Sequence, residues 1–293
     1  MKLYAPAYYK HFKCIAERCE HSCCIGWEID IDSDTFEKYQ NLTADYASAI
    51  RETISTDGTP HFRLGACDRC PHLDEQGLCK IITNIGEDYL CDICREHPRF
   101  YNYTTVAEVG LGLSCPEAAR VVLSSPDFDA IEEIGELSIE ADGIDFDGRT
   151  DRETIYAILQ SEDYAVALEA IYRTYAIEVG EDADWLERLS SLEYLYAEHR
   201  DLFLNYASKR RPAEADESLK RFLAYLVYRH CTEAFDADDF RDRLAFCLFG
   251  ERLLATLISV KSAATLEEIA TLASIISEEI EYSDENTSAL MNP

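Results

Sequence analysis

Apolar residues recur with a helical spacing through the second half of the chain. Trp185, Leu189, Leu192 and Tyr196 follow one another at intervals of three or four positions, which would place them on one face of a helix. Similar runs of apolar residues continue to residue 283. We therefore expect a bundle of about five helices, joined by short loops, over residues 151–283.

Two of these expected helices begin with a capping box, in which a Thr side chain and a Glu three positions later satisfy the first backbone N–H groups. The pairs are Thr150 with Glu153 and Thr265 with Glu268. The last stretch, residues 284–293, is short and polar, so we expect a frayed tail.

The first 126 residues are rich in cysteine and show no sustained period. The sequence "WEIDID" (27–32) alternates apolar and acidic residues, which predicts a short strand. Ser33 and Asp34 then supply a capping signal for a short helix. A further helix is expected where Pro116 takes the first helical position.

Residues 127–150 differ in composition from both flanking regions. They are strongly acidic, and Arg149 is their one basic residue. We interpret them as an exposed connector, with short extended pieces, between a cysteine-rich domain (1–126) and the helical domain (151–283). The expected fold is mainly α, with an irregular, metal-stabilised cysteine-rich N-terminal segment packed on a C-terminal helical bundle.

The cysteines are concentrated in the N-terminal part of the chain. Of the 12 cysteines, Cys231 and Cys247 lie far along the chain and are expected to be buried as small apolar residues. The others are Cys14, Cys19, Cys23, Cys24, Cys67, Cys70, Cys79, Cys91, Cys94 and Cys115. Two-residue spacings let one turn direct two thiolates at one metal ion or cluster.

Three chemistries are compatible with these spacings. A disulfide framework needs an oxidising compartment, for which the sequence gives no export signal. A structural zinc site could be closed by Cys67 and Cys70 together with Cys91 and Cys94. An iron–sulfur cluster takes four thiolates with looser spacing. Spacing alone does not separate zinc from iron.

Three ordered stretches carry a resemblance to a known family. They are "YYKHFKCIAERCEHSCCIGWEIDID" (8–32), "CPHLDEQGLCKIITNIGEDYLCDICREHPRF" (70–100) and "GLSCPEAAR" (112–120). Together they resemble the flagellin lysine-N-methylases and the broader group of CxxCxxCC zinc- or iron-chelating proteins. The likeness covers roughly residues 5–125.

The resemblance implies methyl transfer from S-adenosylmethionine to lysine side chains of flagellin, with a [4Fe-4S] cluster involved. In this likeness Cys67 and Cys91 are local additions whose ligand role is in doubt. The motif cysteines, which the resemblance assigns to metal, are Cys14, Cys19, Cys23, Cys24, Cys70, Cys79, Cys94 and Cys115. Eight thiols exceed the four that one cluster needs, which implies a second metal or some cysteines that are not ligands.

The sequence contains no familiar site for S-adenosylmethionine. The CxxxCxxC pattern of radical enzymes begins at Cys19 and Cys23 but fails at Gly26. A dinucleotide-type fold would show a Gly-rich turn between a strand and a helix, and "EVGLGLSC" (108–115) lacks the third glycine. The catalytic residues are therefore unassigned.

Some side chains near the cysteines are candidates for holding that cofactor. Tyr8, Tyr9 and Trp27 flank the first cysteine group, and aromatic rings bind sulfonium or ammonium groups by cation–π contact. Arg95 and Arg99 could bind a carboxylate or hydrogen-bond to cluster sulfides. For all five, ordinary packing or charge neutralisation is the plain alternative.

Charge narrows the choice of partners. The formal net charge of −30 repels phosphate backbones, which argues against nucleic acid and favours a basic or lysine-bearing protein partner, or solubility alone. The first residues hold no apolar run of signal-peptide length, and no apolar stretch is long enough to span a membrane. We expect a soluble cytoplasmic protein.

Two other functions fit the same residues. A non-enzymatic interaction module with a purely structural zinc ion or cluster is one, and the missing S-adenosylmethionine motif favours it. A redox or electron-transfer protein is the other.

Overall fold

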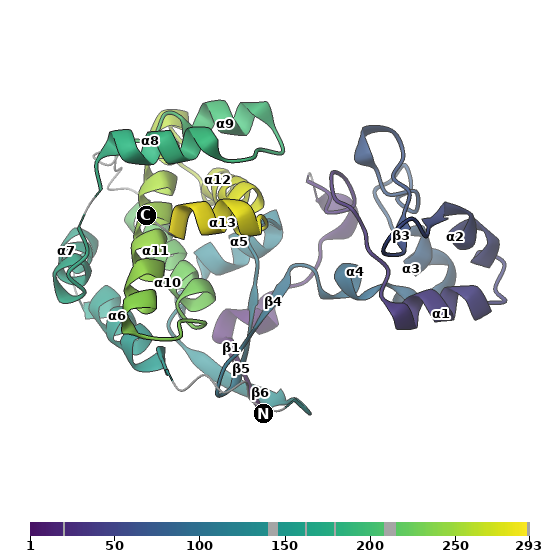
Figure 1. The fold of residues 1–293 in the computed structure, drawn as a ribbon, viewed down its shortest axis with the longest axis horizontal. Helices are drawn as coiled ribbons and strands as arrows, with labels where there is room; N and C mark the ends of the chain where they lie inside the picture. The colour runs from purple at the N-terminus through teal and green to yellow at the C-terminus, as the bar shows by residue number, and fades with distance from the viewer. Residues whose placement is uncertain (20, 140–145, 162, 179, 208–214, 292–293) are drawn as a thin grey trace. The chain divides into compact units, whose positions relative to one another are not determined.

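The chain folds into two compact units. Residues 13–98 form the cysteine-rich unit, and residues 1–12 with 99–293 form the helical unit. The computed structural model (Figure 1) describes all residues from 1 to 293 except 20, 140–145, 162, 179, 208–214 and 292–293.

The cysteine-rich unit is built of short elements around a small core. Its helices and strands are η2 (Ala16–Arg18), α1 (Ser33–Asn41), α2 (Ala47–Thr53), β2 (Ile54–Ser55), β3 (His61–Phe62), η3 (Ala66–Asp68), α3 (Lys80–Ile85), η4 (Glu87–Tyr89) and α4 (Asp92–Glu96). Ile31, Tyr39, Ile50 and Phe62 are its most deeply buried apolar side chains. Cysteine side chains belong to the same core, so this unit packs its thiols together with its apolar residues.

The helical unit contains a four-stranded sheet in the order β4-β5-β1-β6. Its strands are β1 (Lys2–Pro6), β4 (Arg99–Tyr103), β5 (Ala107–Leu111) and β6 (Ile131–Glu136). β1 pairs parallel to β5, with Leu3 opposite Ala107, and antiparallel to β6, with Lys2 opposite Glu136. β4 and β5 are antiparallel. The N-terminal strand therefore joins the sheet between two strands that come from much later in the chain.

Helices make up the rest of the helical unit. After η1 (Ala7–His11) they are α5 (Pro116–Ser124), α6 (Arg149–Ser161), α7 (Tyr164–Thr174), α8 (Asp182–Ser191), α9 (Ala197–Phe203), α10 (Asp216–His230), α11 (Ala237–Lys261), α12 (Leu266–Ile276), the π-helical η6 (Ser277–Glu281) and α13 (Asp284–Met291). Figure 1 shows α10 and α11 running side by side. Every residue of α11 from Phe246 to Ile258 is buried, so this helix is the centre of the core.

Gly250 sets the close approach of these two central helices. A Cβ atom built at Gly250 would lie 2.9 Å from Leu226 Cδ1 on α10. A larger residue would require the Leu226 side chain to move, because a packed core has little free space.

A buried ion pair ties the sheet to the helices. Arg152 on α6 donates two hydrogen bonds to Glu108 on β5, at 2.7 and 2.8 Å, and a third to Thr232. Both charged side chains are almost fully buried. Breaking such a pair by removing one partner leaves an uncompensated buried charge, which costs on the order of 3–5 kcal/mol.

The protein is mainly α, as the periodicity predicts, but its compact units do not follow the expected boundary at residue 126. Residues 99–126 carry β4, β5 and α5 and belong to the helical unit. The expected acidic connector contributes β6, because pairing with β1 recruits residues 131–136 into the sheet. The remainder of that stretch at 140–145 lies outside the described residues.

The expected strand at residues 27–32 is wrong. The segment is extended, but it makes only an isolated bridge between Asp30 and His61, because no neighbouring strand is long enough to pair with it. Its alternation still marks burial, since Ile29 and Ile31 are 4% and 1% exposed. The predicted helix after it is confirmed as α1, although Asp32 provides the cap by accepting a hydrogen bond from Thr35 N.

The stretch around Leu192 and Tyr196, expected to be one helix, is broken between α8 and α9. Buried side chains from the end of the chain explain the break. Glu279 accepts hydrogen bonds from the backbone N–H groups of Leu195 and Tyr196, and Asn286 accepts one from Glu193 N. These backbone N–H groups are hydrogen-bonded to side chains, so they do not require the carbonyl acceptors of a continuous helix.

Two further helix expectations at the ends of the helical region are corrected. α6 begins at Arg149, so Thr150 lies inside the helix, and Asp147 accepts the hydrogen bond from Arg149 N. Residues 284–291 form α13 rather than a frayed tail, because Leu290 is 1% exposed and packs into the core.

Two further expected helix starts are confirmed, whereas the expected number of helices is too low. α12 begins with the complete capping box of Thr265 and Glu268, and Pro116 is the first residue of α5. The described helices from α6 to α13 outnumber the five expected.

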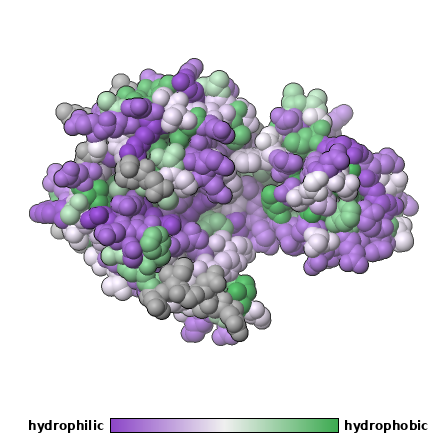
Figure 2. Space-filling model, in the orientation of Figure 1, coloured by the Kyte–Doolittle hydropathy of each residue, from purple (hydrophilic) through white to green (hydrophobic). Residues whose placement is uncertain are grey.

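Hydrophilic residues cover most of the visible face of the molecule in Figure 2, in keeping with its many acidic side chains. Among the described residues, none of the helices combines the length and the hydropathy needed to cross a bilayer.

Candidate metal centre

Cys91 and Cys94 form the tightest thiol pair of the cysteine-rich unit. Cys91 is the N-cap residue of the short helix α4, and Cys94 lies one turn later on the same face. Their Sγ atoms are 3.4 Å apart and share a hydrogen bond, which raises the pKa of Cys94 and lowers that of Cys91. Cys91 is 1% exposed, so this pair faces the core of the unit.

Backbone pairing brings three more cysteines to the same core. Cys70 N donates a hydrogen bond of 2.8 Å to the carbonyl of Cys24. Cys79 forms a bridge with Leu73 and is the N-cap residue of α3. Cys24, Cys70 and Cys79 therefore come from separate segments but pack against one apolar cluster with Cys91 and Cys94.

The proximity of these thiols raises the pKa of Cys70 and Cys79. Burial raises the pKa of Cys70 to about 12, and the charges of Cys24, Cys79 and Cys91 add to this effect. Burial likewise raises the pKa of Cys79, with further contributions from Cys24 and Cys91. The pKa of a thiol rises when another thiolate stands near it, because two like charges repel at short range.

Cys24 differs from the others. A hydrogen bond with Cys23 lowers its pKa to about 7, against the opposing effect of burial, and Ser22 and Arg69 act in the same direction. Cys24 is therefore partly thiolate near neutral pH, and the thiolate is the form that binds metals.

The other predicted ligands do not belong to this core cluster, although Cys23 contacts Cys24 through the hydrogen bond described above. Cys14 and Cys23 are exposed, Cys19 is half-buried with its thiol 2.9 Å from the carbonyl oxygen of His21, and Cys115 is the N-cap residue of α5 in the helical unit. Cys67, which the resemblance sets aside, is exposed. The structure thus groups Cys24, Cys70, Cys79 and Cys94 of the predicted set and adds Cys91.

The donor chemistry of this group fits a soft or borderline metal, because thiolate sulfur is anionic and polarizable. In the part of the chain that the structure describes, no three His, Cys, Asp or Glu side chains are placed to hold an ion as they stand. The five thiols are gathered within one core without forming a closed coordination shell, so a bound metal would draw them together.

His72 is excluded as a further ligand by its neighbours. It is 1% exposed, and its Nδ1 and Nε2 atoms are each 2.9 Å from a hydroxyl, of Tyr46 and Thr53 respectively. Burial lowers its pKa to about 4, so the ring is neutral and serves the packing of the unit.

The candidate cofactor residues are divided between the two units. Tyr9 and Arg99 meet in the helical unit, where Arg99 Nε donates a 2.9 Å hydrogen bond to the Tyr9 hydroxyl and the guanidinium lies over the Tyr9 ring. Tyr8 is 2% exposed in the same unit. Trp27 and Arg95 belong to the cysteine-rich unit, where Arg95 pairs with Asp92 on its own helix.

Comparisons with known proteins place the chain in a family. A lysine-N-methylase of Salmonella choleraesuis is 31% identical over 138 residues, which are 44% of this chain and 34% of that protein. A flagellar biosynthetic protein, FliU, of Salmonella muenchen is 31% identical over 138 residues and is covered to 80% of its length. The chain belongs to the flagellin lysine-N-methylase family.

A lysine-N-methylase of Salmonella typhimurium gives a similar match, with 30% identity over 44% of this chain. The match spans about a third of the length of the two lysine-N-methylases, at 34% of each. No family model matches the chain, and no solved structure matches it.

Cys91 is a cysteine whose ligand role the resemblance leaves in doubt and which the structure places in the thiol group. The sequence signal for this is that Cys91 stands three positions before Cys94, at the start of a helix. What the sequence did not show is that its side chain is buried beside three other segments.

Proposed function

We propose that the protein is a protein-lysine N-methyltransferase that takes its methyl group from S-adenosylmethionine and holds an iron–sulfur centre. The observation that carries this proposal is the match to FliU over 80% of that protein's length, together with relatives named lysine-N-methylase. The grouped thiols support the iron–sulfur centre, because the family resemblance and the spatial cluster of soft ligands both indicate a bound metal.

The centre would be held in the cysteine-rich unit. The five thiols that the fold gathers, Cys24, Cys70, Cys79, Cys91 and Cys94, can supply the four ligands of a [4Fe-4S] cluster. Such a cluster would order the short elements around it, since small cysteine-rich segments gain much of their folding energy from metal.

The substrate class is a lysine-bearing protein, with flagellin as the first candidate. Lysine is a nucleophile only as the neutral amine, and its ordinary pKa of roughly 10.4 requires a site that desolvates it or supplies a base. The formal net charge of −30 attracts a basic substrate surface and increases its rate of encounter. A cytoplasmic location suits a centre bound by reduced thiols.

The test combines metal analysis with methyl transfer on one anaerobically purified sample. We expect iron and sulfide in equal amounts, about four of each per chain as a [4Fe-4S] cluster requires. With S-adenosylmethionine and flagellin, mass spectrometry should then find lysine residues heavier by one methyl group. If the protein holds the cluster but does not methylate flagellin, flagellin is excluded as the substrate. If it methylates no lysine-bearing protein at all, the methyltransferase activity is excluded.

One observation favours a second function. Cys70 and Cys91 are core residues, as expected of ligands to a structural zinc ion in an interaction module. A colourless protein that holds zinc and binds no S-adenosylmethionine would select this alternative. A reversible one-electron couple without methyl transfer would instead indicate an electron-transfer protein.

A further inference from the structure

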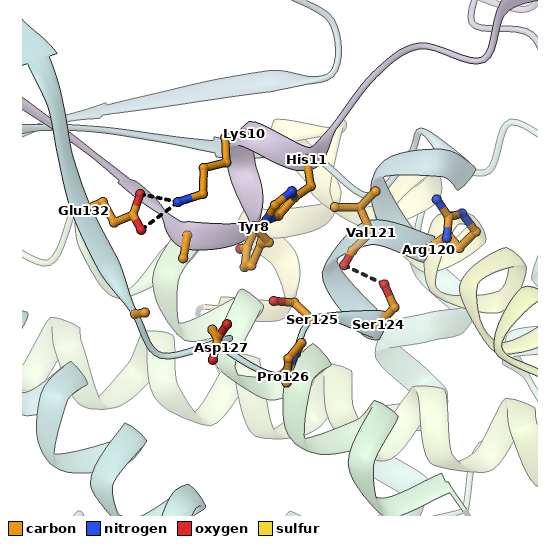
Figure 3. Close-up of a pocket in the computed structure, with 12 residues that line it drawn as sticks. Tyr8, Lys10, His11, Arg120, Val121, Ser124, Ser125, Pro126, Asp127 and Glu132 are labelled. Carbon is orange, nitrogen blue, oxygen red and sulfur yellow. Dashed lines mark hydrogen bonds and ion pairs between the residues drawn. The ribbon is translucent and has the colours of Figure 1, made fainter.

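A cavity of about 400 Å³ lies in the helical unit, next to the turn that follows the first strand. It is open on one side and lined by η1, by the C-terminal end of α5 and by the start of β6 (Figure 3). Small-molecule sites in proteins have volumes of roughly 300–1,000 Å³, so the cavity is large enough for a nucleoside-sized ligand.

Three polar side chains on the cavity wall lack a hydrogen-bond partner among the described residues. Tyr8 is 2% exposed and Ser125 is 9% exposed, while Asp127 stands at the opening. Within the described residues, the side chains of these three form no hydrogen bond and no ion pair. A ligand in the cavity could form the hydrogen bonds that these side chains lack. Figure 3 shows Tyr8, Ser125 and Asp127 around the same hollow.

Charges of both signs surround these groups. Lys10 donates hydrogen bonds of 2.8 and 2.9 Å to the two carboxylate oxygens of Glu132 at one side of the hollow, and Arg120 and His11 stand at another. Arg120 is held by Glu117, with a shortest distance of 2.6 Å, and its side chain remains 43% exposed. The Arg120 guanidinium therefore supplies positive charge on the side of the hollow opposite the Asp127 carboxylate.

The end of α5 adds to the negative side. α5 ends at Ser124, and the carbonyl groups of a final helical turn carry partial negative charge. This end of the helix and the Asp127 carboxylate together favour a bound ammonium group. Arg120 favours a carboxylate, and the hydroxyls of Ser125 and Tyr8 suit the hydroxyl groups of a ribose.

We propose that this cavity binds a zwitterionic amino acid attached to a nucleoside, the chemical class of S-adenosylmethionine, with Asp127 as the partner of its amino group. The identity of the ligand rests on the proposed function, whereas the location of the site rests on the cavity and its unpartnered side chains. The site uses no recognisable sequence motif, because its residues come from three separate segments.

The test is calorimetric titration of the anaerobically purified full chain with S-adenosylhomocysteine, which has the same amino-acid and nucleoside groups. Asp127→Asn should weaken binding roughly tenfold or more, because a hydrogen bond to a charged group contributes about 1.5–3 kcal/mol. Ser125→Ala should weaken it less. Asp129→Asn is the matched control, since Asp129 lies on the same loop but does not line the cavity.

The outcomes separate the site from the function. Weaker binding by Asp127→Asn with normal binding by Asp129→Asn supports the site, provided that both variants melt at the wild-type temperature. Equal affinity of all four proteins overturns the site and leaves the methyltransferase proposal intact. If the wild-type protein does not bind S-adenosylhomocysteine at all, both the site and the use of S-adenosylmethionine are overturned.

Discussion

Cys91 and Cys67 each stand three positions before another cysteine, but their side chains have opposite surroundings. Cys67 is exposed, and burial of Cys91 leaves it 1% exposed and 3.4 Å from the sulfur of Cys94. A thiol held among others in a core is placed to be a metal ligand, whereas an isolated exposed thiol must first recruit partners.

At this scale we predict that Cys91→Ser lowers the metal content of the purified protein to half or less. The control is Cys231→Ser, because Cys231 is also 1% exposed but lies in the helical unit beside Cys247. Both variants place a hydroxyl in a core, so both can lose some stability, but only the first removes a ligand. Full metal in Cys91→Ser would remove Cys91 from the ligand set, as measured by elemental analysis.

The C-terminal elements act on distant parts of the helical unit. Glu279 on η6 holds the backbone of residues 195 and 196 and contacts His199 Nδ1 at 2.6 Å, and Asn286 on α13 holds Glu193. These contacts fix the loop that separates α8 from α9. A terminal helix that satisfies buried backbone groups is part of the fold and does not fray.

At the scale of this element we predict that Leu290→Ala destabilises the protein by about 2–5 kcal/mol, the usual cost of removing a large buried side chain. Leu290 is 1% exposed on α13. Urea unfolding followed by circular dichroism measures the effect. Ala289→Ser, at an exposed position of the same helix, should change the free energy of unfolding by no more than about 0.5 kcal/mol. A Leu290→Ala protein as stable as wild type would mean that the tail does not pack.

At the scale of the whole molecule, buried charge makes stability depend on pH. Burial alone would raise the pKa of Glu281, but the Arg229 charge and the hydrogen bond with His230 outweigh it and lower the pKa to about 2. Tyr225 donates a further hydrogen bond to the same carboxylate at 2.9 Å. Burial also lowers the pKa of His230, against the effect of Glu281.

The direction of the pH effect follows from these shifts. A carboxylate with a lowered pKa in the folded state stabilises the protein above its unfolded pKa of roughly 4.3, and this stabilisation is lost as the pH falls towards 2. His230 adds a loss that begins below roughly pH 6.5, because the unfolded ring takes up a proton that the buried ring resists.

We predict that Glu281→Gln is less stable than wild type by about 3 kcal/mol at pH 7, and that this difference shrinks below about pH 4.5. Urea unfolding of both proteins at pH 7, 5 and 3.5 tests it. Comparing the two proteins at each pH cancels the general effect of protonating a chain with a net charge of −30. A difference that stays constant with pH would show that Glu281 contributes through packing alone.

Local signals in the sequence were enough to identify several features. The capping box of Thr265, the first-turn position of Pro116 and the burial of Cys231 and Cys247 follow from a few neighbouring residues. The ordered cysteine motifs likewise gave the family, which the match to FliU supports. Each depends on chemistry within one segment, which residue order fixes directly.

Tertiary contacts decided the rest. The break before α9 depends on Glu279, which lies more than 80 residues away in the chain. The core position of Cys91 depends on Cys70 and Cys79, and the cavity beside Tyr8 depends on the pairing of β1 with β6. The sequence by itself determined the starts of α5 and α12, buried apolar faces and family membership, because these arise from neighbours along the chain. Only the tertiary structure decided which thiols lie together, which carboxylates are buried and where the cavity lies. These properties arise between segments that are distant in the sequence and come together on folding.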